Sequence, residues 1–479
     1  MDQFFQESRF LCHLEQDGIS ALFHQLHPEP VYLPTTVWNA MDGRLPGNLC
    51  LNDLVVELCE KKMLIASSEI DQQELEVAQK WAIQLLDRPT ILYLMLAQNC
   101  NFACGYCPIP KLAKQYGDSK LSWDDAVAGI QLWEKHIEDF SGEDSEPFFL
   151  VFYGGEPLLN RPVFEKVLPF VEAEKALGRL PQNLELMLCT NGILIDEELV
   201  KLLADHKVMV AVGIDGPSAI NNKSRRTSAG EPTFAGIAQA IKILTANRVK
   251  VVASVIINAE NIAILDEYPK FLQDLGVSKF GFNLLKGNAL LESPLAIDPD
   301  SYYLAAAQGV LSGWNDAHQT DGDDFFEYQL EKKLTALRQA LPFSIDCTCY
   351  GSQLVIQPDG QVTNCPFLRC DQGHVSELPA SFRIADTKTV KAWRQRVPLI
   401  SDRKILGKNY GMLDGGGCAW GTHELLGSVT ATDAGNTVFT QEITHGLIWR
   451  ILEPNRRCQL LNGQIPFWSY RYHRRIGPM

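Results

Sequence analysis

Three cysteines early in the chain have the residue type and the spacing for metal chemistry. Cys100, Cys104 and Cys107 lie in the segment CNFACGYC, a CxxxCxxC pattern. Thiolates are soft ligands that select zinc or iron-sulfur clusters, and three of them leave one coordination position open for chemistry. A structural zinc site would need a fourth ligand, but no further Cys or His follows at the usual zinc-ligand spacing. The pattern therefore favours a reactive metal centre.

This loop, with an aromatic residue just before its third cysteine, resembles that of the radical S-adenosylmethionine (SAM) enzymes, and the resemblance covers roughly residues 90–420. It implies that the three cysteines hold a 4Fe-4S cluster whose fourth iron chelates SAM. It also implies reductive cleavage of SAM to a 5′-deoxyadenosyl radical, which abstracts a hydrogen from the substrate. In such enzymes the cofactor performs the difficult step, and the protein positions the reactants and excludes water.

Further motifs extend this resemblance to a SAM pocket. Residues 154–157 match the family's GGEP motif, whose glycines let backbone groups approach the methionine moiety, and residues 190–192 match its TNG turn. Residues 215–217 match a DGP stretch, and Arg225 matches a following arginine that pairs with the SAM carboxylate, with Arg226 as its competitor. Ordinary turn chemistry and surface charge are the plain alternative for the polar residues. The resemblance implies these cofactor-binding residues: Tyr106, Gly154, Gly155, Glu156, Pro157, Asn191, Asp215 and Arg225.

The late cysteines resemble the SPASM extension of peptide- and protein-modifying radical SAM enzymes, which binds two auxiliary 4Fe-4S clusters. Three of the expected positions before Cys418 hold Ile405, Lys408 and Asp414 instead of cysteine. The resemblance is therefore to the shortened variant called Twitch, with one auxiliary cluster. Four thiolates would close that cluster and make it an electron relay or a structural element. The implied ligands are Cys347, Cys349, Cys365 and Cys418, with Cys370 competing for the place of Cys347 and Asp414 as an oxygen alternative. Free buried cysteines are the plain alternative.

The elements that would position these motifs are six apolar runs that alternate with helical patterns. The alternation predicts an α/β fold with a partial (β/α)6 TIM barrel, and the apolar character indicates parallel strands that are buried on both faces. The first three runs end just before the CxxxCxxC, GGEP and TNG motifs. Functional groups in such folds lie at the carboxyl ends of the strands. The predicted strands are residues 91–96, 148–153, 184–189, 208–214, 249–257 and 279–284.

The patterns on either side of the barrel predict further units. Residues 1–85 read as a small winged-helix-like α+β domain, with short β-prone pieces followed by a helix over 51–61. Residues 354–363, with a Pro-Asp-Gly turn, predict a hairpin inside the cysteine-rich part. The expected organisation is 1–85 for peptide (leader) recognition, 86–295 for the barrel, 296–345 as a helical bridge, 346–425 as the auxiliary-cluster domain, and 426–479 without an assigned role.

Composition and charge exclude several classes of protein. The 479 residues include 43 Lys and Arg against 58 Asp and Glu, a formal net charge of −15, so we expect no nucleic-acid partner. No signal peptide is visible, and no apolar run approaches the roughly 20 residues that span a bilayer. We therefore expect a cytoplasmic protein without a membrane partner. Disulfides are rare in that compartment, which again favours metal binding by clustered cysteines.

The SPASM-type resemblance implies a peptide maturase. Such an enzyme abstracts a hydrogen from a ribosomally synthesised precursor peptide or protein and installs a carbon-carbon or thioether crosslink. The expected partners are that precursor, added as a strand to residues 1–85, and an electron donor such as flavodoxin or ferredoxin.

Three alternatives remain open. A sulfatase-maturase-like enzyme would form formylglycine, although such enzymes normally keep both auxiliary clusters. A peptide epimerase would need a thiol hydrogen donor, for which Cys370 is the catalytic candidate. A non-enzymatic iron-sulfur scaffold would leave the GGEP motif unused. The cysteines outside these sets are predicted to pack in apolar surroundings: Cys12, Cys50, Cys59 and Cys189.

Overall fold

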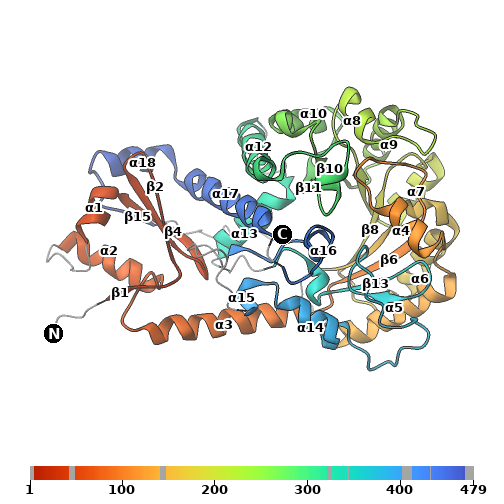
Figure 1. The fold of residues 1–479 in the computed structure, drawn as a ribbon, viewed down its shortest axis with the longest axis horizontal. Helices are drawn as coiled ribbons and strands as arrows, with labels where there is room; N and C mark the ends of the chain where they lie inside the picture. The colour runs from red at the N-terminus through yellow and green to blue at the C-terminus, as the bar shows by residue number, and fades with distance from the viewer. Residues whose placement is uncertain are drawn as a thin grey trace.

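The structure is a computed structural model. It describes residues 5–41, 49–140, 147–320, 326–339, 341, 345–401, 413–431 and 433–469. In these ranges two larger β-sheets lie apart from each other, and helices of the C-terminal part run between them (Figure 1). No helix of the described part is long and apolar enough to cross a membrane.

A mostly parallel sheet forms the centre of the described chain. Its strand order is β12-β11-β10-β9-β8-β7-β6-β13-β14, and only β13 and β14 pair antiparallel. The α/β class and all six predicted strands are confirmed, with ends that differ by a residue or two. The strands are β6 (Ile91–Ala97), β7 (Phe148–Gly154), β8 (Leu184–Thr190), β9 (Met209–Gly213), β10 (Val251–Ile257), β11 (Lys279–Leu284), β12 (Phe326–Glu327), β13 (Gln353–Ile356) and β14 (Val362–Thr363).

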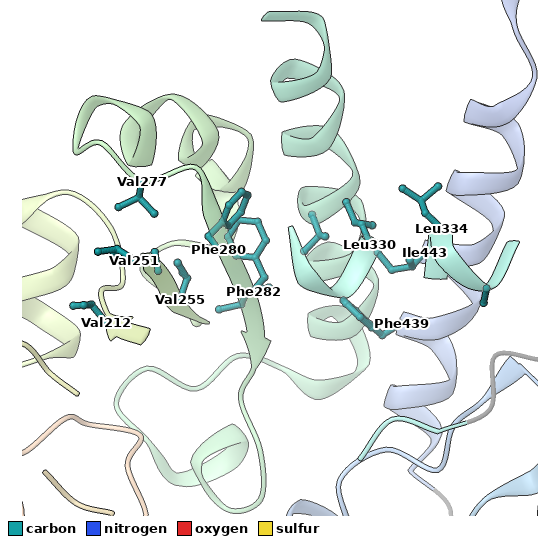
Figure 2. Close-up of a cluster of buried hydrophobic side chains, with 14 of the residues drawn as sticks. Val212, Val251, Val255, Val277, Phe280, Phe282, Leu330, Leu334, Phe439 and Ile443 are labelled. Carbon is teal, nitrogen blue, oxygen red and sulfur yellow. The ribbon is translucent and has the colours of Figure 1, made fainter. Parts of the chain in front are cut away.

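Helices between the strands cover the outside of this sheet (Figure 1). Several begin at a side-chain cap, as α5 does where Ser122 accepts the Asp125 N–H, and α7 where Asp196 accepts the Leu199 N–H. One buried apolar cluster continues from valines of β9 and β10 through Phe280 and Phe282 of β11 to α13 and to α17 (Ala434–Ile451) (Figure 2). The covering helices are α4 (Ile109–Tyr116), α5 (Trp123–Ile137), α6 (Arg161–Ala176), α7 (Glu197–Asp205), α8 (Ser218–Ser224), α9 (Phe234–Ala246), α10 (Tyr268–Asp274), α11 (Ala289–Glu292), α12 (Pro299–Thr320) and α13 (Tyr328–Gln339).

The predicted hairpin at 354–363 is confirmed as β13 and β14. Its place in the fold was not predicted, because β13 adds to the barrel sheet alongside β6, with Leu354 opposite Leu92 and Ile356 opposite Leu94. This pairing sets the cysteines that flank the hairpin beside the strand that leads to Cys100. The short helices of the same region are α14 (Lys388–Arg394), α15 (Pro398–Ser401) and α16 (Ala419–Leu426).

The N-terminal part forms a small antiparallel sheet with helices. The sheet order is β15-β4-β3-β2, and a separate pair joins β1 to β5. The predicted β-prone pieces and the helix near 51–61 are present, whereas the winged-helix-like assignment stays a prediction. The elements are β1 (Gln6–Glu7), β2 (Leu11–Gln16), β3 (Ile19–His24), β4 (His27–Pro34), α1 (Thr35–Ala40), α2 (Leu49–Glu60), β5 (Leu64–Ile65) and α3 (Ser68–Asp87).

The C-terminal segment connects the two sheets. Helix α17 (Ala434–Ile451) packs on α12, and α18 (Pro454–Leu461) packs on β3 and β4. Strand β15 (Trp468–Ser469) then pairs with β4, so the chain's own end covers one edge of the N-terminal sheet. The Tyr32 hydroxyl donates a hydrogen bond to the Ile448 carbonyl at the junction.

Candidate active site

A cavity of about 580 Å³ lies at the carboxyl ends of the barrel strands. Cys100, Cys104 and Cys107 line it on one side, and Cys347 and Cys418 also line it. The first set follows β6, whereas the second set comes from the loop before β13 and from the start of α16. The fold therefore brings both predicted groups of cysteines to one hollow, which sequence separation alone could not show.

The loop of the first three cysteines is anchored by backbone hydrogen bonds. The Ala103 N–H donates to the Arg226 carbonyl at 2.9 Å, and the Gly105 N–H donates to the Ser224 carbonyl at 3.1 Å. Burial raises the pKa of the Cys100 thiol to about 11 and that of Cys104 to about 12. Three thiols that cannot ionise readily alone need a cation to become thiolates, and a bound metal deprotonates a coordinating thiol outright.

This donor set fits an iron-sulfur cluster. In the described ranges no three Cys, His, Asp or Glu side chains converge closely enough for a single metal ion. The thiolates around a four-iron cluster bind different irons, so they stand farther apart than the ligands of one ion. Cys100, Cys104 and Cys107 are the residues that would hold such a cluster at the cavity wall.

Gly154 and Gly155 let the end of β7 pass close to the loop that leads to Cys100. A Cβ atom on Gly154 would lie 2.4 Å from the Ala97 carbonyl oxygen, and one on Gly155 would lie 2.2 Å from that of Asn99. Such contacts are far shorter than any real side chain tolerates. Both glycines line the cavity. Their observed role is therefore to admit the neighbouring backbone, and the contact with a methionine moiety stays a prediction.

Glu156 lies behind the cavity wall and orders the neighbouring turn. Its buried carboxylate accepts the Leu158 N–H at 3.0 Å, the Thr190 hydroxyl at 2.8 Å and the Asn191 N–H at 2.9 Å. Burial raises the pKa of Glu156 to about 7 against these hydrogen bonds. Neither Glu156 nor Pro157 is among the described residues that line the cavity, whereas Asn191 is. Glu156 therefore acts through the position of Asn191.

Asp215 holds two residues of the cavity in place. One of its carboxylate oxygens accepts the Tyr106 hydroxyl at 2.6 Å, and the other accepts the Arg225 guanidinium at 3.0 Å. Tyr106 and Arg225 line the cavity, but Asp215 is fully buried and does not. The Arg225 Nε is a buried donor without a partner in the described structure. Arg226 points elsewhere, to the Gly230 carbonyl at 2.9 Å, so Arg225 is the arginine of the site.

Cys347, Cys349, Cys365 and Cys418 lie within electrostatic reach of one another. Burial raises the pKa of Cys349, and negative charge on the other three raises it further. A hydrogen bond from Cys349 lowers the pKa of Cys347 to about 7. Backbone N–H groups point at two of the sulfurs, from Leu368 to Cys365 and from Gly421 to Cys418, each at 3.4 Å. Such N–H contacts to sulfur are typical of cluster ligands, so these four residues also fit a cluster.

Cys370 packs against the same buried cluster as Cys349 and Cys365. It is half-buried, it does not line the cavity, and its pKa is raised by burial and by Asp371 rather than by another cysteine. Its roles as an alternative auxiliary ligand and as a hydrogen donor stay predictions, and the second would require the substrate to reach it outside the cavity. Asp414 accepts the Gly416 N–H at 2.8 Å and does not line the cavity either. Ile405 and Lys408 lie outside the described residues.

Sequence reasoning missed several residues of the cavity. Cys189, predicted to pack in the core, lines the cavity together with Tyr153. Both stand at the carboxyl ends of strands on the inward-facing side, which strand alternation could have shown. Lys333 of α13 and Asn436 of α17 also line it, and no local pattern points them there.

Comparison with known proteins identifies the core of the chain. Residues 94–272 match the radical SAM superfamily. The chain carries a radical SAM domain. It is an enzyme of this superfamily, which implies a 4Fe-4S cluster and SAM, and both expectations from the sequence are thereby confirmed. The matched residues contain the CxxxCxxC loop, the GGEP motif, Asn191, Asp215 and Arg225.

Relatives of this radical SAM chain are named as sulfatase-maturating enzymes and as a cyclopropyl synthase. It is 22% identical over 301 residues to a cysteine-type anaerobic sulfatase-maturating enzyme of Clostridium perfringens, covering 60% of this chain and 77% of the relative. It is also 22% identical to the radical SAM cyclopropyl synthase TigE of Paramaledivibacter caminithermalis, over 75% of this chain and 78% of the relative. A solved structure of anSMEcpe with bound AdoMet and Cp18Cys peptide shares the fold, with a TM-score of 0.59 at 17% identity over 78% of this chain and 99% of the other.

Proposed function

We propose that this radical SAM enzyme is a peptide maturase that abstracts a hydrogen from a precursor peptide or protein and installs a carbon-carbon or thioether crosslink. The observation that carries the proposal is the single cavity of about 580 Å³ that both groups of cysteines line. Its size suits a short stretch of peptide, since ligand pockets commonly span several hundred Å³. A substrate seated there would meet both reactive centres without moving.

The first group of residues would bind SAM and its cluster. With the cluster bound at Cys100, Cys104 and Cys107, the site supplies the reductive cleavage of SAM. Arg225 presents a buried Nε donor, and Asp215 already holds its guanidinium in place. Binding of a carboxylate to Arg225 would therefore cost little further side-chain entropy. Asn191 is fixed through its amide donor to Asn101 at 2.7 Å. These contacts hold the cofactor side of the cavity rigid.

The second group would remove the electron that crosslinking releases. Cys347, Cys349, Cys365 and Cys418 supply four thiolates, which close a 4Fe-4S cluster and leave it suited to electron transfer. Because Cys347 and Cys418 line the cavity, a cluster held by this group would lie close to a substrate seated there and could accept its electron. A reductant such as flavodoxin or ferredoxin supplies the first electron of each turnover.

The peptide class of the substrate is supported by the relatives. The anSMEcpe structure contains a peptide, and the sulfatase-maturating relatives act on a protein by their names. The N-terminal sheet offers a place for the remainder of a precursor, because β2 forms an edge strand whereas β15 covers the opposite edge. An extended peptide can add to such an edge by main-chain hydrogen bonds.

Formylglycine formation is the second candidate, and the named relatives favour it. The two candidates differ in their products, because formylglycine carries an aldehyde that a hydrazide reagent captures, whereas a crosslinked peptide does not react. Incubating the enzyme with a candidate peptide and a hydrazide probe therefore separates them.

The first test of the proposal is SAM cleavage. Enzyme reconstituted anaerobically and reduced with dithionite should produce 5′-deoxyadenosine, and Cys104→Ala should abolish the product, because a cluster with two thiolate ligands is lost. Circular dichroism checks that the variant remains folded. Full 5′-deoxyadenosine formation by folded Cys104→Ala would contradict the assignment of the first cluster.

A further inference from the structure

Cys189 stands in the floor of the cavity rather than in the packed core. In the parallel ladder Phe152 pairs with Leu188, so the next residues, Tyr153 and Cys189, are neighbours on the opposite face. Cys189 then pairs with Ala211 on the next strand. All three residues of this layer line the cavity. The thiol therefore faces the same space as the cysteines of the first cluster.

The thiol belongs to neither group of cluster ligands and forms no disulfide in the described chain. Burial, with a smaller effect of the Glu156 charge, raises the pKa of Cys189 to about 12. At neutral pH it therefore carries its proton as an S–H group. The pKa of the nearby Tyr153 phenol is raised by burial and further by the charges of Cys189, Cys107 and Cys365, so this layer lies within electrostatic reach of both groups of cysteines.

We propose that Cys189 is an internal hydrogen-atom donor that quenches the adenosyl radical when no substrate covers the cavity floor. The inference rests on the proposed function, because it requires SAM cleavage in this cavity. The step breaks the S–H bond and forms a C–H bond, so the products are 5′-deoxyadenosine and a thiyl radical on Cys189. An S–H bond is weaker than the C–H bond formed, so the transfer is downhill. The low-potential reductant then supplies one electron and the solvent one proton, which restores the thiol.

The other possible hydrogen donors to the adenosyl radical explain why a thiol is useful at this position. An uncovered radical next to β7, β8 and β9 would otherwise attack carbon-bound hydrogens of the cavity wall, such as those of Ile256, and damage the enzyme. A bound peptide separates the radical from the floor and offers its own C–H group instead. Tyr153 is the rival donor, since it also lines the cavity and carries an O–H group.

The test uses substrate-free enzyme, SAM and dithionite in D2O, where the S–H hydrogen exchanges with solvent. We expect wild-type 5′-deoxyadenosine to carry one solvent deuterium in most molecules. Cys189→Ala and Cys189→Ser should lose this deuterium severalfold while still forming 5′-deoxyadenosine, because a serine O–H bond is too strong to give up its hydrogen. Tyr153→Phe and Cys370→Ala should keep the wild-type deuterium content.

Equal deuterium in the wild type and both Cys189 variants would overturn the inference while leaving the proposed function intact. A loss in Tyr153→Phe instead would assign the donor to the phenol and also overturn it. A wild type that forms no 5′-deoxyadenosine would overturn both proposals.

A second measurement does not depend on turnover. Iodoacetamide labelling of reconstituted enzyme, mapped by mass spectrometry, should modify Cys189 several times more slowly when S-adenosylhomocysteine is bound. The labelling of Cys458, which is exposed on α18, should not change. Equal labelling of Cys189 with and without this ligand would show that the thiol lies outside the SAM-accessible space and would overturn the inference.

Discussion

At the scale of single residues, Gly155 determines how closely the GGEP segment approaches the cluster loop. Alanine at this position would place a Cβ atom 2.2 Å from the Asn99 carbonyl, directly before Cys100. We expect Gly155→Ala to lower the stability by roughly 1–3 kcal/mol and to reduce iron loading of the first cluster. Thermal unfolding and iron content per chain measure both effects.

The matched control is Gly178→Ala after α6. Gly178 has a φ of +72° but no heavy atom within 4 Å of an added Cβ, so this change costs about 1 kcal/mol through backbone strain alone. It should leave iron loading unchanged. Equal iron loss in both variants would show that close approach at Gly155 is unimportant.

Glu156 should make the stability of the protein depend on pH, and its burial sets the direction of that dependence. Burial raises the pKa of this carboxyl from 4.5 to about 7, so between these values the native state keeps a proton that the unfolded chain has lost. The stabilisation of the native state by this retained proton is therefore present in full below pH 4.5 and is lost as the pH rises to about 7. The free energy of unfolding falls by at most about 3 kcal/mol over this range. The thermal unfolding midpoint should fall from pH 5 to pH 8, and Glu156→Gln should flatten this fall. Parallel profiles of both proteins would contradict the raised pKa.

At the scale of elements, the hairpin of β13 and β14 carries the auxiliary cysteines to the barrel. Because Cys365 directly follows this hairpin and its thiol does not line the cavity, Cys365→Ala should disturb the second cluster alone. We expect substrate-free 5′-deoxyadenosine formation within about twofold of wild type, together with loss of about four irons per chain. An iron content equal to that of the wild type would remove Cys365 from the ligand set.

The barrel strands were predictable because buried parallel strands produce continuous apolar runs, which helical patterns separate. Local sequence also indicated β13 and β14, through the turn at 358–360. It could not indicate that β13 pairs with β6, because that pairing joins residues far apart in the chain. Helix α17 was not predicted, since its buried side mixes Phe439, Ile443 and Leu447 with polar residues, and this mixture weakens the amphipathic pattern; the buried polar residues are Asn436, Thr437, Thr440 and Thr444.

The candidate site was predictable to a different degree in each of its parts. The spacing of Cys100, Cys104 and Cys107 indicated a metal site without knowledge of the fold. The place of Glu156 behind the wall and of Cys189 in the floor depended on which strand face meets the cavity. Residues from α13 and α17 reach the cavity only through tertiary packing, which no local pattern encodes.

At the scale of the whole molecule, α17 links the cavity to the N-terminal sheet. Asn436 and Phe439 near its start line the cavity, and its end meets Tyr32, whose hydroxyl donates to the Ile448 carbonyl. The Trp449 and Trp468 rings flank the Tyr32 ring at centroid distances of 6.1 Å and 5.5 Å. The C-terminal segment therefore joins the proposed peptide-binding unit and the catalytic core into one structure (Figure 1).

The most direct test of this account is the iron and sulfide content after anaerobic reconstitution. The wild type should bind about eight irons per chain, on four irons per cluster, and the variant with alanine at Cys100, Cys104 and Cys107 should bind about four. That result would establish one radical SAM cluster and one auxiliary cluster around the same cavity. A wild type with about four irons, falling to none in the variant, would contradict it, because the late cysteines would then bind no cluster.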